Sequence, residues 1–344
     1  MIQKVTILIL ISFYSALGNA QKITGFFDQN WRACDAKIAA YYAETEKRDS
    51  LWYRVDYNAR NSKLLKHGTY KDDHTQIRHG RMEYFFSNGS ISEIQHYTNN
   101  KKTGQHLKTY PSGFLSDSFQ FKKDLPYGIC ISWYPDGSVK TEMQLDTLGN
   151  GSGVVIGFFP DGNISFKGQL APGLRKAGNW FYYHANGKKA SVLQYGQPEE
   201  KPIDQTATIY FDEFENAYYD STVKYENAIC YDTVGVQQPE CKLENQAPQY
   251  PGGVKEWTKY LTNYLFRLMS RHGNLQKQIV YINHFIVKPD GELDNIMLDN
   301  TFNQSLDDDV KGIFIKSKKW IPARHNNRII PMLSRQSLTL AANN

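Results

Sequence analysis

Glycines recur along the middle of the chain at a fixed interval, and this recurrence restricts the possible folds more than any other feature. Five of them follow one another at intervals of 24 or 25 residues: Gly89, Gly113, Gly137, Gly162 and Gly187. A second glycine stands nine residues before each of these turn glycines: Gly80, Gly104, Gly128, Gly153 and Gly178. Such self-similarity is typical of proteins that stack copies of one supersecondary unit. We therefore predict consecutive repeats over residues 80–196, one for each turn glycine.

Each repeat has the composition of a β-hairpin. An Asn, Asp or Ser precedes each turn glycine, and Asn-Gly and Asp-Gly supply the positive φ that a tight turn needs. A mostly aromatic column lies three residues before the turn glycines: Phe86, Tyr110, Tyr134, Phe159 and His184. A second column lies eight residues after them: Tyr97, Phe121, Leu145, Leu170 and Tyr195.

A lone hairpin is marginally stable in water, so neighbouring hairpins must share an apolar face. We predict a single-layer antiparallel ladder of hairpins, mainly β, whose core contains the first aromatic column. The alternative is that this column faces solvent as a stacking platform for a glycan or a peptide. In a ladder one sheet thick, we also expect the opposite face to expose Trp133 or Tyr182.

The first twenty residues read as a targeting segment. Lys4 precedes the apolar stretch Val5–Ala16, and small residues stand at Gly18 and Ala20. Twelve residues of helix span about 18 Å, which is short of the roughly 30 Å hydrocarbon core of a bilayer. We predict a signal peptide over residues 1–20, cleaved after Ala20, and a periplasmic or secreted product. A retained membrane anchor is the alternative.

Two regions flank the predicted repeats. Residues 21–79 read as an N-terminal cap with a short helix within Asn30–Tyr42 and a strand at Leu51–Tyr57. A cap is what the bare edge of a ladder requires, because an open edge invites aggregation. Residues 197–246 read as a linker and irregular bridge.

The last hundred residues, 247–344, predict a separate small α+β domain. A helix follows Gly253, with Val254, Trp257, Leu261, Tyr264 and Leu265 on one face. The apolar run Gln278–Val287 predicts a central strand, and Glu292–Leu298 returns beside it.

A second helix and a last strand complete this domain. Ser305 begins a capping box with Asp308, and a buried stripe of Leu306, Val310, Ile313 and Phe314 follows it. Arg328–Leu340 predicts a last strand. The order helix, strand, strand, helix, strand is typical of a compact domain with an antiparallel sheet.

Composition and charge exclude several classes of protein. Hydrophobic residues are 40% and the mean hydropathy is −0.57, which excludes a polytopic membrane protein. A formal net charge of +5 is too small for a dedicated nucleic-acid binder. The positive balance lies at and after Pro248. It indicates either attraction to an anionic membrane or cell-wall surface or to an acidic partner, or an ordinary solvated surface.

The candidate chemical motifs are weak. His67, His74 and His79 lack the spacing of a zinc site, and Gly149–Gly153 lacks the spacing and the following helix of a phosphate-binding loop. We therefore expect no catalytic residue, no metal and no cofactor. A hydrolase without a recognisable motif is the remaining enzymatic alternative.

The four cysteines do not form a disulfide framework. Cys230 and Cys241 are close in sequence, and either a disulfide or two thiols fits an exported chain. Cys130 falls in a predicted strand and is expected to be a buried thiol.

The sequence resembles two known families. The repeat of Gly80–Tyr195 resembles the bacterial, antitoxin-like variant of the MORN repeat. Three segments of the last domain, in order, resemble the C-terminal domain of TonB, the periplasmic energy transducer: Gln249–Gly253, Phe285–Leu293 and Lys319–Ala323.

The second resemblance implies a non-enzymatic protein of a Gram-negative cell envelope. Its last domain would bind an extended segment of an outer-membrane transporter by strand addition, which links it to transport across that membrane. We assign this contact to Arg328–Leu340, with Pro331, Leu333 and Arg335 lining it. We expect no nucleic-acid partner. The alternative is that the repeats bind a toxin, a lipid or a glycan, and that the last domain only docks them.

Overall fold

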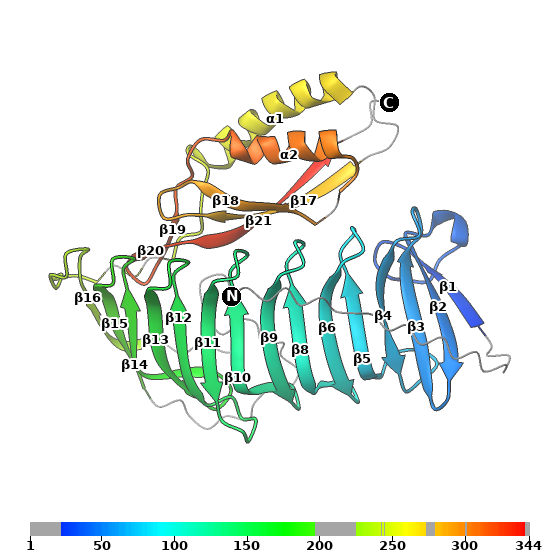
Figure 1. The fold of residues 1–344 in the computed structure, drawn as a ribbon, viewed down its shortest axis with the longest axis horizontal. Coiled ribbons are helices and arrows are strands. Elements are labelled where there is room, and N and C mark those ends of the chain that lie inside the picture. Colours follow the sequence, from blue (N-terminus) through cyan, green and yellow to red (C-terminus); the bar gives the residue numbers. More distant parts are fainter. Residues whose placement is uncertain are drawn as a thin grey trace. The chain divides into compact units, whose positions relative to one another are not determined.

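The computed structural model describes residues 22–196, 225–241, 243, 245–272, 279–299 and 301–340. The predicted signal peptide and residues 197–224 of the predicted bridge lie outside the described residues. The described residues form a sixteen-stranded antiparallel sheet and a small C-terminal region with helices and a three-stranded sheet (Figure 1). This confirms the predicted fold class. The chain divides into two compact units, residues 1–123 and 124–344.

The strands of the first unit pair in the order in which they occur in the chain, except that the two-residue β7 pairs only with β6, and β6 also pairs with β8. They are β1 (Lys22–Phe27), β2 (Tyr41–Arg48), β3 (Leu51–Asn58), β4 (Leu64–Tyr70), β5 (Arg78–Phe85), β6 (Ile91–Thr98), β7 (Lys101–Lys102), β8 (Gly104–Thr109) and β9 (Leu115–Lys122). Residues expected to form a cap therefore contribute β1–β4 to the same sheet as the repeats. The helix expected within Asn30–Tyr42 is a single 3₁₀ turn, Ala36–Ile38, because β2 already begins at Tyr41.

The second unit continues with β10 (Leu125–Trp133), β11 (Val139–Leu145), β12 (Gly153–Phe158), β13 (Ile164–Ala171), β14 (Arg175–Tyr183), β15 (Lys189–Tyr195) and β16 (Tyr225–Cys230). Each strand again pairs with the next along the chain. β16 comes from the predicted bridge and adds to β15.

The C-terminal region of the second unit has the predicted order with one addition. Its elements are α1 (Gly253–His272), β17 (Ile279–Val287), β18 (Leu293–Leu298), α2 (Gln304–Ile315), β19 (Ala323–His325), β20 (Arg328–Ile330) and β21 (Met332–Leu340). The sheet order is β18-β17-β21, with the predicted central strand in the centre. The addition is a separate small hairpin of β19 and β20.

In each repeat, the first glycine and the large residue of the second column are seventeen residues apart, and strand pairing explains this distance. Each glycine nine residues before a turn glycine, here called a strand glycine, lies opposite the residue eight after that turn glycine. The pairs are Gly80 with Tyr97, Gly104 with Phe121, Gly128 with Leu145, Gly153 with Leu170 and Gly178 with Tyr195. The large partners are 3–8% exposed. Every strand glycine has a positive φ, a conformation that residues with a side chain rarely adopt.

The turns differ in detail from the prediction. Each turn glycine has a φ between +78° and +86° and donates its N–H to the carbonyl three residues earlier. The residue before it does not share the positive φ; instead its side chain accepts a hydrogen bond from the backbone two residues on. Asn88, Asp136, Asp161 and Asn186 all do so. The Asn and Asp side chains therefore hold the turn, and the glycine alone supplies the left-handed conformation.

A single-layer sheet buries one face by laying large side chains over glycines. A Cβ built on Gly157 would meet the ring of Phe166, one built on Gly168 would meet Trp180, and one built on Gly68 would meet Met82. This covering also buries Tyr182 completely, against the expectation that Tyr182 is exposed; Trp133 is half-buried.

The first aromatic column is largely core. Tyr134, Phe159 and His184 are buried, and Phe86 and Tyr110 are half-buried. Phe159 packs against Ala323, Ile330 and Met332 of the C-terminal region, so at this position the column is not an open stacking platform.

The C-terminal region has its own apolar core. Trp257 and Leu268 of α1 pack with the predicted stripe of α2, including Val310 and Ile313, and with β17. Val254 is 81% exposed and not on the core face, because the contacts of α1 begin one turn later at Trp257.

The start of α2 also differs from the prediction. Asn303 is the N-cap, since its side chain accepts a hydrogen bond from the Leu306 N–H at 2.9 Å. Ser305 lies inside the helix. In the part of the chain that the structure describes, no helix combines the length and the apolar character that crossing a membrane requires.

Candidate functional site

The strand assigned to partner binding forms an open edge of the C-terminal sheet. β21 pairs with β17 over nine residues without interruption, and no other described strand pairs with its second side. The opposite edge, β18, is interrupted by a register shift, and its Asn295 has a φ of +49°. Bulges of this kind hinder the addition of a further strand. β21 is therefore the edge better suited to accept one.

The residues proposed to line this edge have different positions. Leu333 lies opposite Ile286, and Arg335 lies opposite His284. Both side chains alternate with the residues that face the helices, so they lie on the far face of the sheet. Arg335 is exposed and Leu333 is half-buried.

Pro331 lies between β20 and β21 and divides the predicted strand into these two shorter strands. It has no N–H for a ladder, so the prediction of one strand from Arg328 to Leu340 is wrong. Only Met332–Leu340 is available at the open edge.

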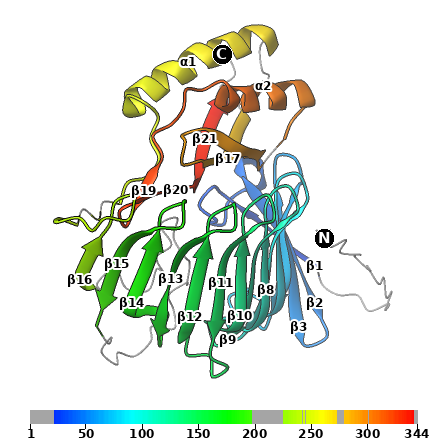
Figure 2. The same ribbon diagram turned by 60° about the vertical axis from the view of Figure 1, so that its left-hand side comes forward.

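The first part of the predicted strand, Arg328–Ile330, forms β20 and pairs with β19. Asn326 and Asn327 form the two-residue turn between β19 and β20, both with positive φ. The Ser191 hydroxyl donates to the Asn326 carbonyl at 2.9 Å. The side-chain amide of Asn327 donates to the carbonyls of Ala190 and Tyr231 at 2.9 and 2.8 Å. The hairpin is thus fastened to the edge of the large sheet near β15 and β16 (Figure 2).

Arg328 is the central side chain of this contact and is 2% exposed. Its guanidinium lies 5.1 Å from the ring centroid of Tyr182 and 5.9 Å from those of Phe159 and Phe166. It also donates a hydrogen bond to the Ser165 hydroxyl. Stacking of a guanidinium on aromatic faces is favourable when the site excludes water. Phe159 belongs in addition to a small apolar cluster with Ala323, Ile330 and Met332.

His325 lies beside Arg328 in the same contact. Burial, together with the positive charges of Arg328 and Lys176, holds the pKa of His325 well below its usual value. The imidazole is therefore neutral near pH 7. The sequence signal for this hairpin was Asn326-Asn327, a pair that tolerates the left-handed conformation of a tight turn.

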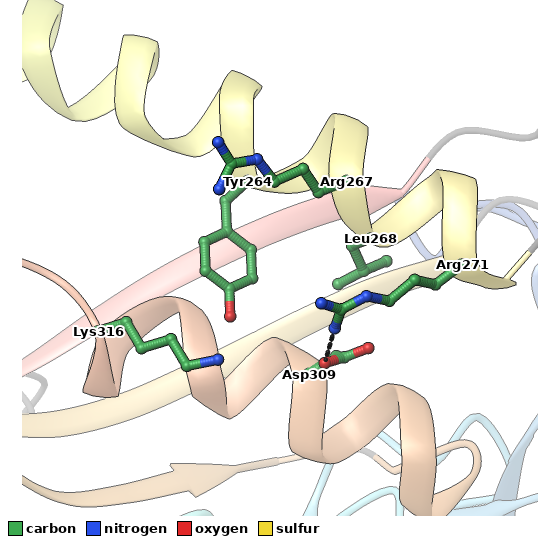
Figure 3. Close-up of a pocket in the computed structure, with 6 residues that line it drawn as sticks. All are labelled: Tyr264, Arg267, Leu268, Arg271, Asp309 and Lys316. Carbon is green, nitrogen blue, oxygen red and sulfur yellow. Dashed lines mark hydrogen bonds and ion pairs between the residues drawn. The ribbon is translucent and has the colours of Figure 1, made fainter.

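A second site lies between the two helices, where the structure shows a groove (Figure 3). Its lining residues are Tyr264, Arg267, Leu268, Arg271, Asp309 and Lys316. The Arg271 guanidinium pairs with the Asp309 carboxylate at 3.0 Å, and the His272 ring lies 2.8 Å from its second oxygen. The groove is predominantly basic, and no sequence motif marks it because its walls come from two helices.

An exposed aromatic cluster lies at the start of the first unit. Trp31 is 41% exposed, has a φ of +60°, and stacks on Tyr41 with 4.4 Å between ring centroids. The Lys66 ammonium lies 5.1 Å from the Trp31 ring and 3.4 Å from the buried Asp56 carboxylate. A positive φ at a bulky residue is rare and costs conformational energy.

The structure shows which cysteines form a disulfide and which are free thiols. Cys230 and Cys241 form a disulfide with 5.0 Å between their Cα atoms. Cys130 is a buried free thiol, and Cys34 is a half-buried one.

The three histidines considered as metal ligands do not converge. His67 pairs with Glu83 at 3.0 Å, and His74 lies near Asp73 at the surface. Within the described ranges, no group of three or more His, Cys, Asp or Glu side chains could hold a metal ion.

Comparison with known proteins identifies the hairpin unit. A family model of the MORN repeat variant matches residues 78–99. These residues form the hairpin of β5 and β6, which contains Gly80, Gly89 and Tyr97. The chain therefore carries a MORN-variant repeat within its long antiparallel sheet. No curated protein matches the chain.

Proposed function

We propose that this chain is an exported, non-enzymatic interaction protein of the cell envelope. Its C-terminal region binds an extended segment of a partner protein by adding it as a strand beside β21. The observation that carries the proposal is the uninterrupted open edge of β21, whereas β18, at the opposite edge of the sheet, is bulged. Main-chain hydrogen bonds along such an edge provide affinity, and alternate side chains provide selectivity.

The class of partner follows from the resemblance to the TonB C-terminal domain. The marker segments of that resemblance precede α1, span the turn after β17, and precede β19. The proposed partner is therefore a periplasmic segment of an outer-membrane transporter. The proposed location is the periplasm, reached through cleavage of the signal peptide near Ala20.

Photo-cross-linking from β21 tests this proposal in the full chain. A photoreactive residue replaces Ser337, which is exposed on β21, and the protein is incubated with a detergent extract of outer-membrane proteins. The matched control carries the same residue at Asp294, which is exposed on β18. We expect a defined transporter peptide to be cross-linked from position 337 and not from position 294.

Hydrogen exchange then distinguishes strand addition from simple proximity. The cross-linked segment is synthesised and added to the unmodified protein. We expect slower exchange of amides along Met332–Leu340, and weaker binding to the Leu333→Asp and Arg335→Glu variants. Equal cross-linking from both positions, or unchanged exchange in β21, would contradict the proposal.

One observation favours the alternative function, in which the repeat sheet binds a ligand itself. Trp31 presents an exposed ring, stacked on Tyr41 and close to the charged pair of Lys66 and Asp56. Such a surface suits a glycan of the cell wall better than a toxin or a lipid, since a flat ring stacks on sugar faces while charged groups bind hydroxyls.

A titration with a soluble cell-wall glycan fragment tests this alternative. Trp31→Ala should abolish binding, whereas Ile38→Ala, which removes another exposed apolar side chain nearby, should not. Binding that survives Trp31→Ala would reject the alternative.

A further inference from the structure

The groove between α1 and α2 has the composition of an anion-binding site. Figure 3 shows Lys316 and Arg271 extending into it from opposite ends, with the Tyr264 hydroxyl between them and Arg267 above. We propose that this groove binds a phosphate group, held by Arg267, Arg271 and Lys316. The groove contains no residue of β21, which lies in the sheet beneath the helices.

The charges in the groove do not balance. Asp309 is the only carboxylate among its lining residues, and it already pairs with Arg271 and His272. Among the described residues, Arg267 and Lys316 have no carboxylate within ion-pair distance, and both are exposed. Two positive charges therefore remain uncompensated on opposite sides of one groove. A dianionic group between them would relieve their mutual repulsion.

Gly312 leaves room for the Tyr264 side chain beside the groove. Gly312 lies on α2 and is buried, and a Cβ built on it would stand 2.9 Å from the Tyr264 hydroxyl. The Tyr264 ring can therefore reach between the helices, where its hydroxyl faces the cavity. The Tyr260 hydroxyl nearby is already used, since it donates to the Ile313 carbonyl at 2.7 Å.

The donors fit a phosphate better than a carboxylate. Arg271 gives one N–H of its NH1 group to Asp309, and other N–H groups of its guanidinium remain available. Guanidinium groups match the tetrahedral oxygens of phosphate with parallel hydrogen bonds, and lysine adds a point charge. Arg267, Arg271, Lys316 and Tyr264 together offer donors from several directions, as a tetrahedral anion requires.

Two sources can supply a phosphate group of this kind, a free phosphomonoester or a lipid headgroup. Isothermal titration of the full chain with phenyl phosphate and with inorganic phosphate probes the first source. Co-sedimentation with vesicles that contain phosphatidic acid in phosphatidylcholine, compared with phosphatidylcholine alone, probes the second. Either result supports the site, and the comparison tells which source it takes.

The variants make the proposal specific. Arg267→Gln and Lys316→Gln should each weaken binding by about fivefold or more, since each removes a charged donor. Lys259→Gln, on the exposed side of α1 outside the groove, should leave binding unchanged. Asp309→Asn should strengthen binding several-fold, because it removes the negative charge and releases Arg271.

Thermal unfolding of each variant shows whether it is folded, and titration is interpreted for folded variants. Gly312→Ala provides a second, uncharged test, since it should displace Tyr264 and weaken phosphate binding. The proposal is overturned if no phosphate compound binds to the wild-type chain. It is also overturned if Lys259→Gln weakens binding as much as the two groove variants do.

Discussion

Gly157 of β12 lies directly beneath the ring of Phe166 in β13, its partner across the strands. A Cβ on Gly157 would stand 1.9 Å from the nearest ring carbon, and Phe166 itself is completely buried. The ring thus occupies the volume that a side chain at position 157 would need. Repeated along the sheet at Gly68 and Gly168, this arrangement gives a single layer a packed apolar face without a second sheet.

The first prediction follows from this contact. Gly157→Ala should lower the free energy of unfolding by about 1–3 kcal/mol, because the buried Phe166 ring must move out of its packed position. Urea-induced unfolding followed by fluorescence measures the change. Phe166→Leu in the Gly157→Ala background should recover part of the loss. A Gly157→Ala variant as stable as wild type would show that the ring moves freely.

The turn glycines give a second prediction with a different cause. Gly137 has a φ of +86°, and a Cβ there would meet no atom within 4 Å. Gly137→Ala should therefore cost about 1 kcal/mol through backbone strain alone, and Gly137→Asn should cost less, since Asn tolerates this conformation. Chemical denaturation of the three proteins provides the comparison. Equal losses for Ala and Asn would argue against backbone conformation as the cause.

The third prediction concerns the contact between the β19–β20 hairpin and the large sheet. Arg328→Ala should destabilise the second unit by about 2–4 kcal/mol, because it removes a buried charged donor and leaves the Ser165 hydroxyl and three rings without their partner.

Arg328→Lys keeps the charge but loses the flat guanidinium, so it should recover only part of the stability. Hydrogen exchange at Asn327 should increase in both variants, since its side chain anchors the turn. Wild-type exchange in Arg328→Ala would mean that the backbone contacts alone hold the hairpin.

The fourth prediction concerns pH. His106 is buried against Tyr97 and Phe121, and burial lowers its pKa from 6.5 to about 4. Between these two values, the unfolded chain binds a proton that the folded chain does not. Stability is therefore full above pH 6.5 and falls as the pH is lowered towards 4, by at most about 3 kcal/mol for this group.

The midpoint of urea unfolding at pH 7 and at pH 5 measures this dependence. His325 acts in the same direction, so the informative quantity is the difference between wild type and His106→Gln. That variant should lose part of the pH dependence, whereas His74→Gln, at an exposed site, should keep all of it. An unchanged dependence in His106→Gln would refute the assignment.

Several elements of the C-terminal region were predictable because residues close together in the sequence determine them. The stripe Leu306, Val310, Ile313 and Phe314 is buried as its spacing indicates, and the apolar run ending at Val287 is the central strand. Helix boundaries were less predictable, since Asn303 and Ser305 are both good N-caps and only the backbone shows which one accepts the hydrogen bond.

The candidate sites were not predictable to the same extent. Arg328 was expected at an open edge, but it is buried against rings that precede it by more than 140 residues. The groove of Arg267 and Lys316 joins residues of two helices that are separated by two strands. No local pattern marks either contact, because each depends on how distant elements pack.

The sequence by itself determined the hairpin repeat, because a glycine with positive φ at regular intervals is a constraint that each turn imposes on its own backbone. It also determined the order of elements in the C-terminal region, through the periods of its apolar residues. The tertiary structure alone decided that β1–β4 extend the same sheet, that Pro331 separates a docked hairpin from an open edge, and which charges remain unpaired. These outcomes depend on contacts between residues far apart in the chain, whose free energy no local spacing encodes.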